Sequence, residues 1–372
     1  MKTVNKNLLE LCLSPDLGGL ELYMMRSAKA LNEKMNVISV IAEKTKLKQY
    51  YEDEQYQYEQ IKRNRSFSFS AARKLAKIID AHAIEVIHMH WTKDLPIAVM
   101  AKLLSKRKPK LVQTRNMTMT RFKDDFYHRF LYKHMDMVLA VTHQVAQQVQ
   151  KFIPEGIRPK VEVLYMGSDK PEILSDEAIQ AYKKEIGVQE DEFLVGMVGR
   201  IEQMKGQYLL IEALEKLKSH SIRACFVGHA MEESYQKELD VMVSSKGLED
   251  KVSFLGFTKN PHRFMQACDC VVLATPCETF GLVVIEAMQV GTAVVATNDC
   301  GPLEIIEDGK SGLLFEKNSS EDLADKLMQL IQDSGYKETL AKSAQERTEA
   351  LFSNEKQFEA LYTHLNAIVE EK

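Results

Sequence analysis

The sequence lacks the features that mark membrane-spanning, exported or zinc-binding proteins. No apolar run reaches eighteen residues, and the apolar stretch near the N-terminus is interrupted by Glu10, so we expect neither a transmembrane helix nor a signal peptide. The six cysteines have neither C-x-x-C spacing nor the paired Cys and His spacing of a zinc site. We therefore expect a cytoplasmic protein, and we expect Cys225, Cys268 and Cys270, which lie in or beside apolar runs, to be small core residues.

Charge is distributed unevenly between the two halves of the chain. Residues 1–169 hold 28 Lys and Arg against 18 Asp and Glu, a net charge of +10, whereas the remaining residues hold 21 against 35, a net charge of −14. A basic half indicates a polyanionic partner such as anionic lipid, nucleic acid or a phosphorylated acceptor. Attraction between two oppositely charged domains explains the asymmetry equally well.

The length of the chain predicts two domains. Its 372 residues exceed what one hydrophobic core usually supports, and its composition, 45% hydrophobic and 27% charged, is ordinary for a globular protein. We expect an N-terminal domain at 1–168, a linker at 169–190, a C-terminal domain at 191–353 and a terminal helix at 354–372 that could cross back to the N-terminal domain.

Strand and helix patterns alternate through both halves, which predicts mostly parallel sheets with right-handed crossovers. In the first half we expect strands at 8–13, 37–42, 85–90, 111–114, 137–141 and 161–164. In the second half we expect strands at 193–198, 222–227, 252–255, 270–274 and 293–297.

Two segments interrupt this alternation. Residues 43–70 are polar and dotted with aromatic residues, which predicts a surface excursion; its basic end at 62–70 would be either a solvated loop with two buried phenylalanines or a contact with lipid. Near the end of the second half, Gly309 and Gly312 before an apolar L-L-F run predict a small hairpin-like turn.

The stretch P-C-E-T-F-G-L-V-V-I-E-A-M-Q-V-G at 276–291 joins an expected buried strand to a helix that begins at Gly281 or Leu282. The first N–H groups of a helix lack intrahelical partners and lie at the positive end of its dipole, so they can hold a diphosphate. Glu278 would precede the helix and Glu286 would lie within it. Two carboxylates around a diphosphate suit a hydroxyl-rich ligand, because carboxylates accept hydrogen bonds from sugar hydroxyls.

Further polar residues follow other strands at the edge where open α/β sheets bind ligands. Arg200 and Lys205, on the loop after the first strand of the second half, could neutralise a diphosphate or could be ordinary surface charges. Gly18 and Gly19 follow the first strand of the chain, where they could face a ligand or only form a turn.

The N-terminal half supplies candidates for binding an acceptor. His90 and Trp91 stand where one strand ends, and Arg115, Asn116 and Arg121 follow the next strand along the chain. Because positive charge is concentrated after that second strand, we expect a phosphorylated or lipid-linked partner there.

These motifs together resemble the retaining glycosyltransferases of family 4. The resemblance rests on the two glutamates separated by seven residues in E-T-F-G-L-V-V-I-E, on the G-R and K-G pairs at 199–206, on Gly301, Pro302 and Glu304, and on the early G-G-x-E. It implies the GT-B fold, an α/β architecture of two Rossmann-like domains with mostly parallel sheets that face each other across a cleft.

The resemblance also implies roles for individual residues. Arg200 and Lys205 would bind the donor diphosphate, Glu278 would hold the donor sugar, and Glu286 would accept hydrogen bonds from the ribose. The remaining donor contacts would be backbone groups, contributed by Phe280, Gly281, Leu282, Val283, Gly18 and Gly19.

The acceptor side departs from the family pattern. Arg115 and Asn116 stand where many members have a histidine, and Met166-Gly167 replaces the common Asn-Gly pair.

The implied reaction is transfer of a sugar, with retention of configuration, from a UDP-, GDP- or ADP-sugar to a hydroxyl of a saccharide or lipid-linked saccharide in synthesis of cell-envelope glycans such as lipopolysaccharide or capsule. No D-x-D motif or other metal cluster occupies a suitable loop, so we expect no metal cofactor. We expect no nucleic-acid partner and a cytoplasmic location, with peripheral contact to an anionic membrane. The alternatives are a nucleotide-sugar epimerase of the same architecture and a non-catalytic nucleotide-sugar-binding subunit.

Overall fold

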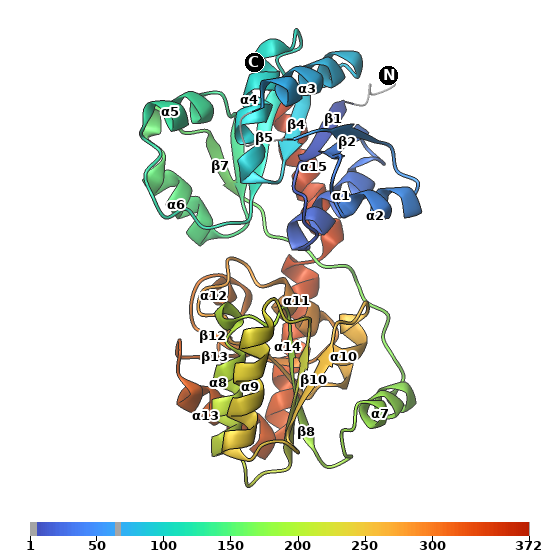
Figure 1. The fold of residues 1–372 in the computed structure, drawn as a ribbon, viewed down its shortest axis with the longest axis vertical. Coiled ribbons are helices and arrows are strands. Elements are labelled where there is room, and N and C mark those ends of the chain that lie inside the picture. The colour runs from blue at the N-terminus through green and yellow to red at the C-terminus, as the bar shows by residue number, and fades with distance from the viewer. Residues whose placement is uncertain (1–5, 64–67, 372) are drawn as a thin grey trace. The chain divides into compact units, whose positions relative to one another are not determined.

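The computed structural model describes residues 6–63 and 68–371 of the chain. The chain divides into two compact units, an N-terminal unit of Met1–Tyr165 and Glu355–Lys372 and a C-terminal unit of Met166–Asn354. Each unit is an α/β structure built on its own parallel sheet, with helices packed on it (Figure 1). No helix in the described residues combines the length and apolar character that a membrane span requires.

The N-terminal unit contains a seven-stranded parallel sheet in the order β3-β2-β1-β4-β5-β6-β7. Its strands are β1 (Asn7–Cys12), β2 (Asn36–Ala42), β3 (Tyr58–Ile61), β4 (Val86–Met89), β5 (Lys110–Arg115), β6 (Met137–Ala140) and β7 (Lys160–Val163). Strand order changes direction between β1 and β4, and the crevice at the carboxyl ends of two such strands is where open α/β sheets bind ligands.

Helices α1 (Gly19–Leu31), α2 (Leu47–Asp53), α3 (Phe69–Ala81), α4 (Leu95–Leu104), α5 (Phe126–Lys133) and α6 (His143–Phe152) connect these strands, with short 3-10 turns at Thr92–Asp94 and Glu155–Ile157. The start of α6 illustrates why they form where they do. The hydroxyl of Thr142 accepts a hydrogen bond from the backbone N–H of Val145 at 3.2 Å and so caps this helix.

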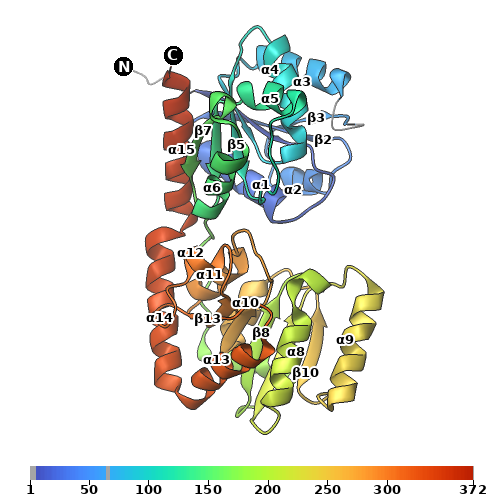
Figure 2. The same cartoon turned by 90° about the vertical axis from the view of Figure 1, so that its left-hand side faces the viewer.

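The last helix of the chain, α15 (Asn354–Glu370), packs on the N-terminal unit although it follows the C-terminal unit in sequence (Figure 2). Tyr23 of α1 contacts the ring of Phe358, and Lys6 forms an ion pair with Glu370 at 2.9 Å. One apolar face of α15, with Leu361 on it, is buried. The chain therefore passes from the first unit to the second and returns.

The C-terminal unit contains a six-stranded parallel sheet in the order β10-β9-β8-β11-β12-β13. Its strands are β8 (Phe193–Val198), β9 (Ile222–Val227), β10 (Val252–Gly256), β11 (Cys270–Leu273), β12 (Ala293–Thr297) and β13 (Leu313–Phe315). Its helices are α7 (Asp176–Glu185), α8 (Gln207–Lys216), α9 (Glu233–Lys246), α10 (Pro261–Ala267), α11 (Leu282–Gln289), α12 (Pro302–Ile305), α13 (Ser320–Gln332) and α14 (Ser334–Leu351), with a 3-10 turn at Gln203–Lys205.

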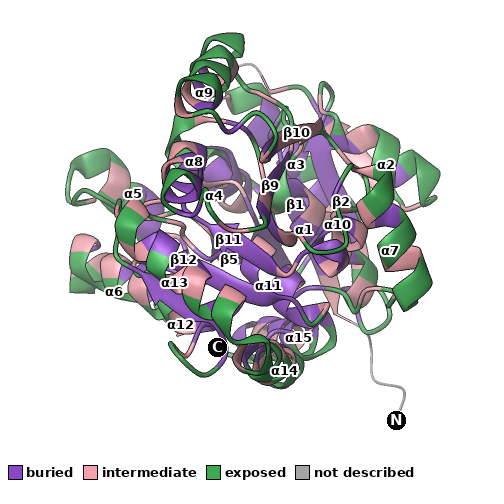
Figure 3. Ribbon diagram, turned by 90° about the horizontal axis from the view of Figure 1, so that it is seen from below, coloured by how far each residue is buried: buried purple, intermediate pink, exposed green. Residues whose placement is uncertain are grey.

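Burial explains the apolar runs that predicted the strands (Figure 3). Every residue of β11 and β12 is buried, as expected of central parallel strands covered by helices on both faces. Cys225, Cys268 and Cys270 are free and buried, which confirms that they are core residues.

Two details of the predicted organisation were wrong. Residues 43–70 are not only a surface excursion, because they contain α2 and the edge strand β3, whose polar sequence Y-E-Q-I conceals its pairing with β2. The apolar run at Leu313–Phe315 is not half of a hairpin, since it pairs in parallel with β12.

Two further segments bear on the expected organisation. The expected linker contains α7, which packs against α10 within the C-terminal unit. Of the basic aromatic stretch 62–70, residues 64–67 lie outside the described part of the chain.

Candidate donor and acceptor sites

The switch point of the C-terminal sheet lies between β8 and β11. The chain runs from β8 outward to β9 and β10 on one side, and from β11 outward to β12 and β13 on the other. Consequently the loop after β8 and the loop after β11 emerge side by side at the carboxyl edge. These loops carry Lys205 and Glu278, two of the residues that the sequence proposes as donor ligands.

An ion pair joins the two loops. The Nζ of Lys205 donates to the Oε2 of Glu278 at 2.8 Å, and each side chain is 24% exposed. Gly206, which follows the lysine, has a φ of +75° and would place a Cβ only 2.4 Å from the carbonyl oxygen of Ala274. A glycine is therefore required at this position for the loop that carries Lys205 to pack against the end of β11.

The loop after β11 turns into α11 through a second special glycine. Gly281 has a φ of +107° and caps the helix, whose first residues are Leu282 and Val283. The ring of Phe280 is 4% exposed and anchors the turn in the core. The predicted start of the helix is confirmed, with Glu278 before it and the half-buried Glu286 within it.

The loop after β12 packs against this turn and forms a hydrogen bond with it. The N–H of Gly301 donates to the carbonyl of Glu278 at 2.8 Å, and a Cβ on Gly301 would lie 2.2 Å from the carbonyl oxygen of Phe280. A disulfide between Cys277, which precedes Glu278, and Cys300, which precedes Gly301, links the same two loops. This pair could not be predicted from local patterns, because the two cysteines are 23 positions apart and their proximity depends on the strand order.

Arg200 lies on the same loop as Lys205, but its side chain pairs with Glu202 rather than with Glu278. It is exposed, and its Nη2 contacts the Oε1 of Glu202 at 2.9 Å. The structure thus brings Lys205 and Glu278 together at the carboxyl edge, whereas the guanidinium of Arg200 is exposed and pairs with Glu202.

In the N-terminal unit, the carboxyl edge at the switch point carries the two early glycines and a buried histidine pair. Gly18 and Gly19 are exposed, and Gly19 is the first residue of α1. His90 follows β4 directly but does not open to solvent, since only 1% of it is exposed.

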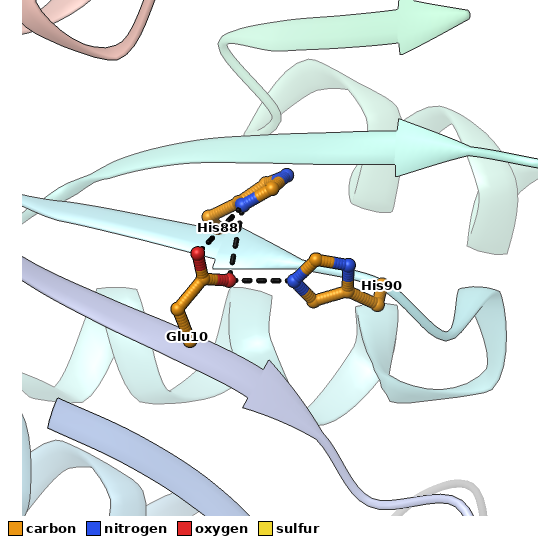
Figure 4. A group of neighbouring side chains, drawn as sticks. All are labelled: Glu10, His88 and His90. Atoms are coloured by element: carbon orange, nitrogen blue, oxygen red, sulfur yellow. Dashed lines mark hydrogen bonds and ion pairs between the residues drawn. The ribbon is translucent and has the colours of Figure 1, made fainter. Parts of the chain in front are cut away.

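His88, His90 and Glu10 form a buried hydrogen-bonded cluster (Figure 4). The Nε2 of His90 lies 2.5 Å from the Oε2 of Glu10, and the Nδ1 of His88 lies 3.0 Å from the same oxygen. Ser27 donates to the other oxygen of Glu10 at 3.1 Å, and the Nε2 of His88 lies 2.7 Å from the hydroxyl of Thr114. Within residues 6–63 and 68–371 this is the one group of side chains with metal-ligand composition and spacing.

The protonation of this cluster follows from its contacts. Burial raises the pKa of the Glu10 carboxyl, but the two imidazoles outweigh it and lower that pKa to about 2. Burial and the neighbouring His88 hold the pKa of His90 below its usual value. A neutral His90 therefore donates its Nε2 proton to an ionised Glu10, and hydrogen bonds satisfy the cluster as it stands.

Two cations lie close to the ring of Trp91. The guanidinium of Arg63 is 4.2 Å from its ring centroid and the ammonium of Lys93 is 5.2 Å away. Nearby, Asp94 is fully buried, and one of its oxygens accepts a hydrogen bond from the N–H of Leu13 at 2.7 Å. Burial raises the pKa of the Asp94 carboxyl to about 7, although this hydrogen bond and the charge of Arg63 both lower it.

The other acceptor candidates follow β5. Arg115 is its last residue and is buried, Asn116 is half-buried, and Arg121 is exposed. The sequence placed these residues at a strand end correctly, but it did not predict that the guanidinium of Arg115 points inward.

Two family models match the chain. The model for glycosyl transferases group 1 matches residues 178–347, and the model for glycosyl transferase 4-like proteins matches residues 10–148. The chain belongs to the group 1 glycosyltransferases. This confirms the family resemblance and the predicted GT-B fold, with two Rossmann-like domains.

Relatives of this glycosyltransferase include enzymes of known activity. The N-acetyl-alpha-D-glucosaminyl L-malate synthase of Bacillus anthracis is 26% identical over 306 residues, which are 80% of this chain and 79% of that protein. The N-acetylgalactosamine-N,N'-diacetylbacillosaminyl-diphospho-undecaprenol 4-alpha-N-acetylgalactosaminyltransferase of Campylobacter jejuni is 29% identical over 232 residues, which are 60% of this chain and 59% of that protein.

A solved structure extends the similarity to the whole fold. The Anabaena protein HepE, crystallised in complex with UDP and glucose, superposes with a TM-score of 0.85 at 25% sequence identity. The match covers 98% of this chain and 100% of that chain.

Proposed function

We propose that this glycosyltransferase transfers a sugar from a nucleotide-sugar to an acceptor hydroxyl with retention of the anomeric configuration and without a metal ion. The observation that carries the proposal is the ion pair of Lys205 with Glu278 across the switch point of the C-terminal sheet. A cation and a carboxylate at that edge, beside the N-terminus of α11, suit the two ends of a diphosphate-linked sugar.

The donor diphosphate would replace the carboxylate as the partner of Lys205. Its phosphate oxygens would accept from the ammonium of Lys205, from the guanidinium of Arg200 and from the first N–H groups of α11. Glu278, released from the ion pair, would accept hydrogen bonds from hydroxyls of the sugar. Glu286, eight positions further along the chain and about one turn into α11, would accept them from the ribose.

The reaction then needs little further machinery. The bond between the anomeric carbon and the diphosphate oxygen breaks, and the nucleoside diphosphate leaves with the bonding electrons. The acceptor oxygen bonds to the anomeric carbon from the same face and passes its proton to the departing phosphate. Lys205, Arg200 and the helix dipole stabilise the negative charge that grows on the leaving group.

The acceptor is proposed to be a saccharide or lipid-linked saccharide of the cell envelope, bound by the N-terminal unit at the cytoplasmic face of the membrane. The names of the relatives from Bacillus anthracis and Campylobacter jejuni support an acceptor with anionic groups or a lipid diphosphate. The segment 117–130 supports membrane contact, because it exposes apolar side chains such as Phe122 at 63% and Phe126 at 89% near Arg121 and Arg129.

The nucleotide can be identified by thermal denaturation with UDP, GDP and ADP, each compared with its monophosphate. A diphosphate at about one hundred times its dissociation constant stabilises the folded protein by about 2.7 kcal/mol. We expect one diphosphate to raise the unfolding temperature and its monophosphate to be much less effective. If no diphosphate does so at millimolar concentration, the proposed donor site is wrong.

A further inference from the structure

Arg115 ends β5 with an incompletely bonded guanidinium. Its Nη2 donates to the backbone carbonyl of Thr118 at 3.0 Å, whereas its buried Nε and Nη1 have no hydrogen-bond partner within the described residues. The side chain as a whole is 5% exposed. Buried N–H groups are almost always paired, and a guanidinium has five of them in a planar fork, so this arrangement leaves strong donors unused.

The charge of Arg115 is also uncompensated. It forms no ion pair in residues 6–63 and 68–371, and burial lowers the pKa of its guanidinium. Burial lowers the pKa of Lys123, and the positive charges of Arg121 and Arg115 lower it further, so no anion near Lys123 outweighs these cations. The acidic neighbour Asp125 is already engaged, because it caps α5 by accepting from the N–H of His128 at 3.1 Å.

A second unpaired polar group lies on the same face of β5. Side chains alternate along a strand, so Gln113 and Arg115 point to the same side of the sheet. Gln113 donates from Nε2 to the hydroxyl of Thr92 at 2.9 Å, but its Oε1 is buried without a donor in the described part of the chain. The Oε1 of Gln113 is an acceptor and needs a donor such as a hydroxyl of the acceptor sugar, whereas the buried cation of Arg115 is costly unless it is paired and needs an anion.

We propose that Arg115 binds an anionic group of the acceptor, a phosphate or a carboxylate, through the N–H groups that its hydrogen bond to Thr118 leaves unused. The inference rests on the proposed function and specifies the acceptor. A guanidinium holds its N–H donors in a planar fork from which they can reach the oxygens of a carboxylate or phosphate, whereas a lysine offers only a point charge. The acceptor reaches this fork from the carboxyl edge of β5, where the carbonyl of Thr118 now covers one end of it.

Thermal denaturation of the full chain tests the site without any need for turnover. Inorganic phosphate and L-malate are titrated at constant ionic strength, with chloride as the balancing anion. We expect one of them to raise the unfolding temperature of the wild type in a saturable manner. Arg115→Gln should need at least tenfold more of it, and Arg115→Lys should respond more weakly than the wild type.

Arg73 provides the matched control. It is an exposed arginine of α3 in the same unit, and Arg73→Gln should respond to the anion like the wild type. Arg115→Met separates binding from folding. Because it removes an unpaired buried charge, its unfolding temperature without added anion should equal or exceed that of the wild type.

Three results would overturn the proposal: neither anion acts saturably on the wild type, Arg115→Gln responds as the wild type does, or Arg115→Met lowers the unfolding temperature. Response to both phosphate and malate assigns a general anion site, and response to one identifies the class of acceptor. The UDP, GDP and ADP arms are run on the same samples. If a diphosphate stabilises the protein while neither anion does, this inference fails and the proposed donor site stands; the reverse result rejects the donor site alone.

Discussion

Replacing Lys205 by methionine should separate binding of the donor from stability of the fold. The ammonium now pairs with Glu278 at 2.8 Å, and both side chains are about a quarter exposed. Such a partly exposed pair contributes roughly 0.2–1 kcal/mol to the free energy of unfolding. A charge-assisted hydrogen bond from Lys205 to a diphosphate is worth about 1.5–3 kcal/mol. Since about 1.4 kcal/mol is a factor of ten, the dissociation constant should rise roughly 10- to 150-fold.

The assay is calorimetric titration with whichever diphosphate stabilises the wild type, together with chemical denaturation of the same variants. Lys246 supplies the matched control, because it pairs with Glu215, its side chain is 23% exposed, and it ends α9 away from the carboxyl edge of the sheet. Lys246→Met should lose a similar small amount of stability and bind the diphosphate unchanged.

Two results would refute this reasoning. One is a dissociation constant of Lys205→Met within twofold of the wild type, which would show that the lysine does not contact the diphosphate. The other is equal weakening by Lys205→Met and Lys246→Met, which would show a nonspecific effect of charge.

Three further predictions concern other parts of the chain. Replacing Cys277 and Cys300 by serine opens a loop of 23 positions and should lower the free energy of unfolding by about 3 kcal/mol, measured in urea, with dithiothreitol having the same effect on the wild type only. The pKa of Asp94 is about 7 in the folded protein, so its carboxyl binds more protons there than in the unfolded chain. The free energy of unfolding should therefore fall by at most about 4 kcal/mol as pH rises from about 4 to about 7, and Asp94→Asn should flatten this dependence. Gly301→Ala should weaken diphosphate binding at least tenfold, because the added Cβ would displace the carbonyl of Phe280. The circular dichroism spectrum should not change. An affinity equal to that of the wild type would show that this turn is not part of the donor site.

Local patterns in the sequence predicted most of the elements and the placement of the donor candidates. The buried strand at 270–274 and the helix after Gly281 could be predicted because apolar runs and a left-handed glycine are local signals. The strand order then follows the rule for a parallel sheet, which is why Lys205 and Glu278, 73 positions apart, could both be assigned to one edge.

Contacts between distant segments could not be predicted in this way. The pairing of Glu10 with His88 and His90 depends on the register of β1 with β4, in which Glu10 lies opposite His88. The edge strand β3 was missed because only Ile61 of its four residues is buried, so no apolar run marks it. The inward orientation of Arg115 was hidden for the opposite reason, since a charged residue at a strand end is ordinarily expected in solvent.

The anomeric configuration of the first product tests whether this glycosyltransferase retains configuration without a metal ion. Proton NMR can follow the full chain as it consumes an α-linked UDP-, GDP- or ADP-glucose in the presence of EDTA, with or without an added acceptor, before the free sugar equilibrates. A retaining, metal-independent transferase should give the α-configured sugar first and release one nucleoside diphosphate for each sugar transferred or hydrolysed. Appearance of the β-configured sugar first, or turnover only after a divalent ion is restored, would contradict the account.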